Sequence, residues 1–124
     1  MHPTGSVGGD LLALAQLFVD LLLNTTTGRV LPRMIGEIAA GSPLGRRYAD
    51  SVIRPRRGLA AELFRRGMAR GELPPDLDVE LAVDALFGPI IVRRLLAGER
   101  IADGFAERLV HGVLHGLGVP SPEA

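Results

Sequence analysis

Apolar residues recur along the chain with the three- and four-residue spacing of amphipathic helices, and the pattern predicts no strand. One apolar stripe, in the first predicted helix, consists of Leu14, Leu17, Phe18, Leu21 and Leu22. The pattern therefore predicts an all-α fold, a five-helix bundle. The expected helices cover residues 10–23, 28–40, 43–70, 78–97 and 103–117.

Local capping residues support these helix ends. Asp and Ser side chains can accept hydrogen bonds from the free N–H groups of a first helical turn. The predicted N-caps are Asp10, Ser42, Asp78 and Asp103. Glycine readily takes the left-handed conformation that ends many helices. The predicted terminating glycines are Gly41, Gly71 and Gly98.

The two ends of the chain differ in composition from the helical part. Residues 1–9 are rich in glycine and have no apolar period, so we expect a flexible leader. Residues 10–117 are expected to form one helical domain. Residues 118–124 contain two prolines and are expected to be a frayed tail.

Two prolines fall near the middle of predicted helices. Pro55 and Pro89 lack a backbone donor and crowd the preceding turn, so each predicts a kink. Kinked neighbours cannot pack along their whole length. Space is therefore expected between the third and fourth predicted helices, near Tyr48, Val52 and Phe87.

The fourth predicted helix has two apolar stripes. The first consists of Val83, Phe87, Ile90 and Ile91. The second consists of Leu81, Ala85, Gly88, Val92 and Leu96. A surface helix needs one apolar face, and small residues let another helix come close, so the second stripe predicts a twofold dimer interface. The alternative is that this helix is simply central within a monomer.

Charge and cysteine content exclude several classes of function. Arg and Lys total 14, as do Asp and Glu, so a net charge of +0 gives no general attraction to nucleic acid or anionic membrane. All the cations are Arg, and their pairs are expected on a solvated face. Cys is absent, which removes disulfides and thiolate zinc sites and fits a cytoplasmic protein. The apolar run at residues 11–23 is too short to span a bilayer, so no membrane is expected.

One constellation could hold a metal. His111 and His115 are four residues apart, with Glu107 one turn earlier, which places all three on one helix face. No independent further ligand can be identified, so a polar solvent face is the favoured interpretation. We therefore expect no metal, no cofactor and no catalytic residue. A metal-dependent enzyme built on these three residues is kept as an alternative.

Three segments together resemble the C-terminal domain of tetracycline-repressor-type (TetR-family) transcriptional regulators. They are RPRRGLAAELFRRGMARGELPPDLD at 54–78, ELAVDALFGPIIVRRLLAGERI at 80–101 and FAERLVHGVLHGL at 105–117. The resemblance covers about half of the chain strongly. It implies that an N-terminal helix-turn-helix domain for DNA is absent from this chain.

The resemblance also implies roles for particular residues. In such proteins the last two helices form a four-helix dimer interface. The implied interface residues here are Leu81, Ala85, Gly88, Pro89, Val92, Leu96, Leu109 and Val113. The inducer pocket of such proteins lies among the first four helices of the domain. The implied ligand-binding residues are Phe18, Met34, Ile38, Tyr48, Val52, Leu63 and Phe87, for each of which ordinary core packing is the competing interpretation.

The sequence therefore predicts an effector-sensing and homodimerisation domain of a transcriptional repressor. The effector is expected to be a lipophilic small molecule, because the candidate pocket residues are mostly apolar. DNA would be bound only through the absent domain. The competing hypothesis is a homodimerisation bundle with no specific ligand.

Overall fold

The computed structural model describes residues 5–116, and within them the chain is helical with no strand. Two of the helices contain a π-helical segment, labelled η1 and η2. The elements are α1 (Val7–Asn24), α2 (Thr27–Ala40), α3 (Pro43–Tyr48), η1 (Ala49–Ile53), α4 (Arg54–Ala69), α5 (Val79–Ile91), η2 (Val92–Leu96) and α6 (Phe105–His115). Since α3, η1 and α4 follow one another without a break, as do α5 and η2, the predicted five-helix architecture is confirmed.

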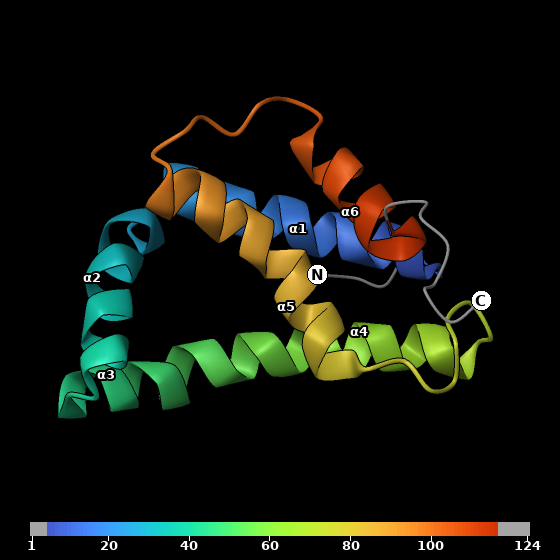
Figure 1. Ribbon diagram of the computed structural model, residues 1–124, viewed down its shortest axis with the longest axis horizontal. Coiled ribbons are helices and arrows are strands. Elements are labelled where there is room, and N and C mark those ends of the chain that lie inside the picture. Colours follow the sequence, from blue (N-terminus) through green and yellow to red (C-terminus); the bar gives the residue numbers. More distant parts are fainter. Residues whose placement is uncertain (1–4, 117–124) are drawn as a thin grey trace, which may run out of the picture.

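Figure 1 shows a triangular outline with α1 along its upper side, and α5 slopes from the lower side up to the upper left corner. Helix α2 forms the left side, and α3, η1 and α4 form the lower side as one continuous rod. Helix α6 lies against the N-terminal half of α1. Helix α1 is the central element, because it contacts α2, α4, α5 and α6.

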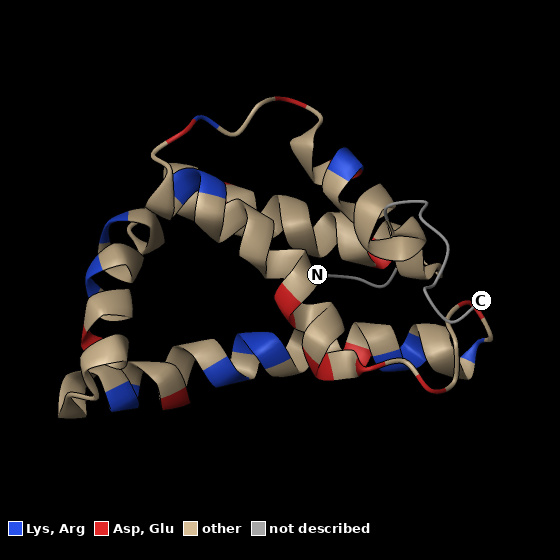
Figure 2. Cartoon of the chain, in the orientation of Figure 1, with Lys and Arg blue, Asp and Glu red and all other residues tan. Residues whose placement is uncertain are grey.

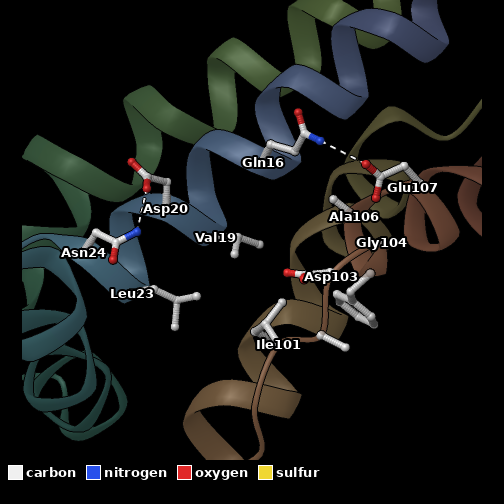
Figure 3. Close-up of a pocket in the computed structure, with 12 residues that line it drawn as sticks. Gln16, Val19, Asp20, Leu23, Asn24, Ile101, Asp103, Gly104, Ala106 and Glu107 are labelled. Carbon is white, nitrogen blue, oxygen red and sulfur yellow. Dashed lines mark hydrogen bonds between the residues drawn. The ribbon is translucent and has the colours of Figure 1, made fainter.

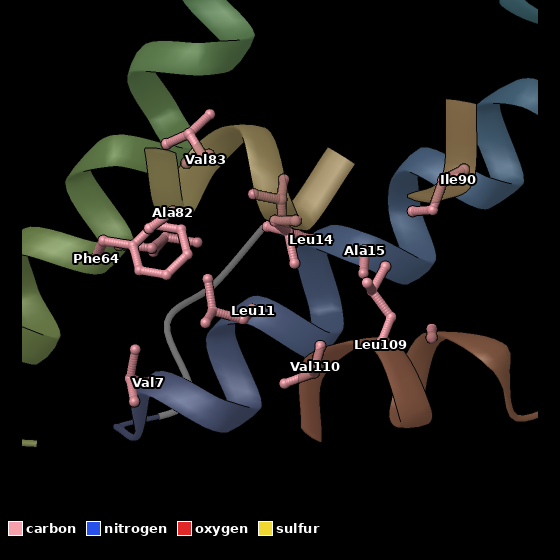
Figure 4. Close-up of a cluster of buried hydrophobic side chains, with 14 of the residues drawn as sticks. Val7, Leu11, Leu14, Ala15, Phe64, Ala82, Val83, Ile90, Leu109 and Val110 are labelled. Carbon is pink, nitrogen blue, oxygen red and sulfur yellow. The ribbon is translucent and has the colours of Figure 1, made fainter. Parts of the chain in front are cut away.

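The hydrophobic core surrounds α1 near its N-terminal half (Figure 4). Leu11 and Ala15 of α1 are fully buried, as are Phe64 of α4 and Ile90 of α5. A glycine lets the helices approach closely, since a Cβ on Gly67 would lie 2.8 Å from Val7 Cγ2. The core therefore packs the C-terminal end of α4 against the start of α1.

Several predicted caps are confirmed. The Ser42 hydroxyl accepts a hydrogen bond from the Gly45 N–H at 3.0 Å, and the Asp78 carboxylate accepts one from the Leu81 N–H at 3.1 Å. The predicted terminating glycines all have positive φ, and they are Gly41, Gly71 and Gly98. These ends follow from interactions over three or four residues, which a sequence displays directly.

Two predicted caps are wrong. The first helix begins at Val7, and Ser6 caps it by accepting a hydrogen bond from the Gly9 N–H at 3.1 Å. Asp10 instead lies fully buried within α1, with its carboxylate 3.7 Å from the Arg70 guanidinium. Asp103 caps nothing either, because α6 starts after Gly104, which has a left-handed backbone and no side-chain cap. The expected end at Leu117 and the tail lie outside the described residues.

The helix around Pro55 accommodates the proline without a sharp break. The π-helical segment η1 ends two residues before Pro55, and the Arg54 N–H donates to the Ala49 carbonyl five residues back. A π turn is a known way to take up a proline or an extra residue within a helix. Helix α5 likewise continues through Pro89 to Ile91 before passing into η2.

The length of α1 corrects the expectation that the apolar run at residues 11–23 is too short to span a bilayer. The helix has 18 residues with a mean hydropathy of 1.5, so by length and composition alone it is long and apolar enough to cross a bilayer. It is longer than the predicted run because it starts at Val7. Its contacts with four other helices give its apolar residues another explanation, since a core helix has the same composition.

Candidate functional site

An apolar cavity of about 400 Å³ lies between α1, α2, α4 and α5. Its volume falls within the range of small-molecule sites, about 300–1,000 Å³. Helix α1 contributes Leu14, Leu17, Phe18 and Leu21 to the wall. The other apolar wall residues are Leu31, Ile35, Ile38, Ile53, Leu59, Phe87 and Ile91.

The cavity wall contains three of the seven residues that the sequence assigned to a ligand. Phe18 and Phe87 meet edge to face in the wall, with their ring centroids 5.1 Å apart, and Ile38 lines it from α2. Leu63 is not a wall residue, because it is buried in the core. The remaining three, Met34, Tyr48 and Val52, are partly buried nearby but do not line the cavity.

The sequence analysis missed two arginines. Arg56 and Arg57 were expected on the solvent side of the third predicted helix, but both line the cavity and both are partly buried. Among the residues that the structure describes, they are the only polar ones in the cavity wall. The hydrophobic periodicity and the composition of the sequence could not have placed these arginines at the cavity, because an arginine pair on a helix is usually solvated.

The two arginines differ in their ion pairing. Arg57 Nη1 lies 2.7 Å from Asp84 Oδ1 on α5, so its charge is compensated within the protein. Arg56 has no hydrogen bond or ion pair with any residue of the described range 5–116. The wall of the cavity therefore holds one compensated cation and one uncompensated cation.

A second, more polar hollow of about 280 Å³ lies between the C-terminal half of α1 and residues 101–107. Four of its polar side chains bind one another in two pairs, as Figure 3 shows. Gln16 Nε2 donates to Glu107 Oε1 at 3.1 Å, and Asn24 Nδ2 donates to Asp20 Oδ1 at 2.7 Å. A ligand here would have to replace these bonds, which makes the apolar cavity the better candidate.

The outer face of α5 and η2 exposes an apolar stripe. Leu81 is 63% exposed, Val92 50% and Leu96 73%. A Cβ on Gly88 would meet no atom within 4 Å. Of the other residues assigned to a dimer face, Ala85 is exposed, Pro89 and Val113 are partly buried, and Leu109 is buried in the core of the single chain. Leu109 therefore offers little surface to a second subunit.

The histidine constellation has no metal-site geometry in the described residues, where no group of three or more metal-ligating side chains is found. The rings of His111 and His115 lie together, with centroids 4.5 Å apart. The Glu107 carboxylate is engaged by Gln16. Glu107, His111 and His115 are all exposed on α6.

Comparisons with known proteins agree with the helical architecture. The family described as "Tetracyclin repressor-like, C-terminal domain" matches residues 1–113. The "Uncharacterized HTH-type transcriptional regulator YdeS" of Bacillus subtilis (strain 168) is 31% identical over 114 residues, which are 92% of this chain and 57% of that protein.

A solved structure is also similar. The "Crystal structure of TetR family transcription regulator SCO0332" matches with a TM-score of 0.85 and 35% identity, over 94% of this chain and 64% of that one. The chain thus spans less than two thirds of the length of both relatives.

Proposed function

The chain belongs to the tetracycline-repressor-like C-terminal domain family of transcriptional regulators, and on that premise we propose that it is the effector-sensing and homodimerisation domain of a transcriptional repressor. Its relatives are transcriptional regulators and not enzymes, which rules out the metal-dependent enzyme considered from the sequence. A regulator of this kind acts in the cytoplasm, in agreement with a chain that has no cysteine.

The apolar cavity is the observation that carries the sensing role. Of the thirteen wall residues in the described part of the chain, eleven are Leu, Ile or Phe. A lipophilic molecule that fills it gains about 25 cal/mol for each Å² of apolar surface removed from water. The effector is therefore a lipophilic small molecule.

The exposed stripe of α5 and η2 supports the dimerisation role. Leu81, Val92 and Leu96 lie in water in the single chain, and burying them against a second copy removes that apolar surface from water. The open space at Gly88 lets a partner helix approach the backbone. A twofold dimer buries the same stripe from both subunits.

Ligand binding and DNA binding are coupled by linkage in this proposal. A ligand contacts α1, α4 and α5 at once, so it favours one relative placement of these helices. In the dimer that placement sets the separation of two helix-turn-helix domains, which must match half-sites about 34–36 Å apart. The helix-turn-helix domain is that of a longer protein, as in the relative YdeS, whose name describes it as an HTH-type regulator.

Binding of a neutral apolar dye tests the sensing role. N-phenyl-1-naphthylamine should become fluorescent on binding to the wild-type domain, and Leu17→Trp should weaken its binding because the larger ring occupies the cavity. Leu44→Trp is the matched control, since Leu44 is similarly exposed (47% against 42% for Leu17) but does not line the cavity. The control variant should bind the dye as the wild type does.

The competing function, a dimerisation bundle with no ligand, makes the opposite prediction. The dye then binds equally to wild type, Leu17→Trp and Leu44→Trp, or binds to none of them. Either result would remove the sensing role and leave only the dimerisation role.

A further inference from the structure

The cavity wall combines an apolar surface with a single kind of polar group. Within residues 5–116, the polar lining of the cavity comes from Arg56 and Arg57, which follow one another on α4. Figure 2 shows that basic positions recur along this helix. Helix α1, which supplies the opposite wall, has only two charged residues, Asp10 and Asp20, and neither lines the cavity.

The charge balance at the cavity is positive. Asp84 compensates Arg57 through the 2.7 Å ion pair between α4 and α5. Arg56 has no such partner among the described residues, and it is partly buried. A guanidinium that is partly removed from water beside an apolar surface attracts an anion more strongly than one in bulk solvent, because the effective dielectric constant is lower.

From this arrangement we propose that the effector is an amphiphilic anion, an alkyl or aryl chain that ends in a carboxylate. The carboxylate binds Arg56 at the wall, and the chain fills the apolar space towards Phe18 and Phe87. The inference rests on the proposed sensing function and specifies the chemical class of its ligand. Guanidinium and carboxylate form paired, charge-assisted hydrogen bonds, which orient the ligand as well as attract it.

If the guanidinium of Arg56 pointed into solvent, the cavity would have no preference for anionic over neutral ligands. Long arginine side chains can cover apolar surface with their methylene groups while the charged end remains in water. In that case Arg56 adds wall area but no preference for charge. A neutral ligand and an anionic ligand of the same chain length would then bind equally well.

Displacement of N-phenyl-1-naphthylamine by ten-carbon ligands separates these two arrangements. The ligands are decanoate, 1-decanol and decyltrimethylammonium, each below its aggregation concentration at pH 7.5 and low salt. Decanoate should bind about tenfold more tightly than decanol, and decyltrimethylammonium more weakly than either. Raised salt should reduce the preference for decanoate, because a partly exposed ion pair is screened.

Variants of the charged residues test whether Arg56 causes the preference for decanoate over decanol. Arg56→Gln should abolish the preference for decanoate over decanol, and Arg56→Lys should restore part of it, because lysine keeps the charge but loses the paired geometry. Arg65→Gln is the matched control on the same helix, since Arg65 is exposed and lies outside the cavity. Asp84→Asn should tighten decanoate binding about twofold or more, because it frees Arg57.

The outcomes distinguish this inference from the proposed function. If decanoate and decanol displace the dye equally, or if the preference survives in Arg56→Gln, the domain still senses lipophilic ligands and the anionic class is wrong. If the dye and all three ligands fail to bind, the sensing function itself is wrong and the inference fails with it.

Discussion

The ring of Phe18 on α1 meets the ring of Phe87 on α5 edge to face, with the planes inclined at 74° and the centroids 5.1 Å apart. Edge-to-face geometry places the positive edge of one ring on the negative face of the other. Both rings belong to the cavity wall, so the contact holds the two helices together beside the candidate ligand.

Replacement of each phenylalanine by leucine should reveal this contact. Phe18→Leu and Phe87→Leu should each lower the free energy of unfolding by about 1–2 kcal/mol. In a double-mutant cycle the two changes should show a coupling energy of about 0.5–1.5 kcal/mol. Urea denaturation measures all four proteins, and strictly additive effects would mean that the rings do not interact.

A second relationship ties the start of α1 to the loop after α4. The Val7 N–H donates to the Glu72 carboxylate at 3.0 Å, and the Arg70 Nε–H donates to the same carboxylate at 2.5 Å. The bond from Val7, followed by the hydrogen bond and charge of Arg70, holds the pKa of Glu72 below its usual value of 4.5, and these effects outweigh the opposing effect of burial.

The depressed pKa of Glu72 predicts a specific dependence of stability on pH. Because the folded-state pKa is below the unfolded one, the contribution is complete above about pH 4.5 and is lost as the pH falls through the folded value. Glu72→Gln should therefore lower stability at pH 7 and lose less stability than wild type between pH 6 and pH 3. Urea denaturation at several pH values checks this, and Glu99→Gln, at an exposed loop residue, should follow the wild-type curve.

The ion pair of Asp10 with Arg70 should also affect stability. The Asp10 carboxylate is fully buried and lies 3.7 Å from Arg70 Nη2, so Arg70→Ala removes a cationic partner from a buried charge. Breaking a fully buried pair costs about 3–5 kcal/mol, but a third of the Arg70 side chain is in water, so we expect about 1–3 kcal/mol. Arg65→Ala, at an exposed position of the same helix, should change stability by less than about 0.5 kcal/mol. Equal losses from the two variants would argue against a role for the pair.

A test of the proposed dimer needs a substitution that blocks the interface but leaves the fold of the single chain unchanged. Gly88→Arg meets this condition, because a side chain at Gly88 has open space in the single chain. It should convert the wild-type dimer into a folded monomer, since a charge without a partner in an apolar interface costs several kcal/mol. Light scattering at tens of micromolar measures the mass, and circular dichroism checks the fold.

Gly36→Arg is the matched control for this experiment. Gly36 is an exposed helical glycine on α2 with equally open space around it, so the same substitution should leave the dimer unchanged. A wild-type protein that is monomeric, or a Gly88→Arg variant that remains dimeric, would contradict the proposed interface.

The sequence by itself determined the number and type of the helices and most of their ends. Ser42 and Asp78 bind N–H groups three residues ahead, and Gly41 takes a left-handed conformation at the end of α2. These interactions are local, so the residue type and its neighbours along the chain suffice to predict them. The apolar period likewise indicated which residues share an apolar stripe on each helix, including Phe18 and Phe87.

Only the tertiary structure decided what covers each stripe. Asp10 has the residue type of a cap, but its carboxylate lies beside Arg70, far along the chain, and so it belongs to the core. Leu63 and Ile38 have the same chemistry, yet Leu63 fills the core and Ile38 lines the cavity. Arg56 belongs to the cavity for the same reason. A cavity is the space left between several helices, and its position depends on their relative placement, which a period along one helix does not contain.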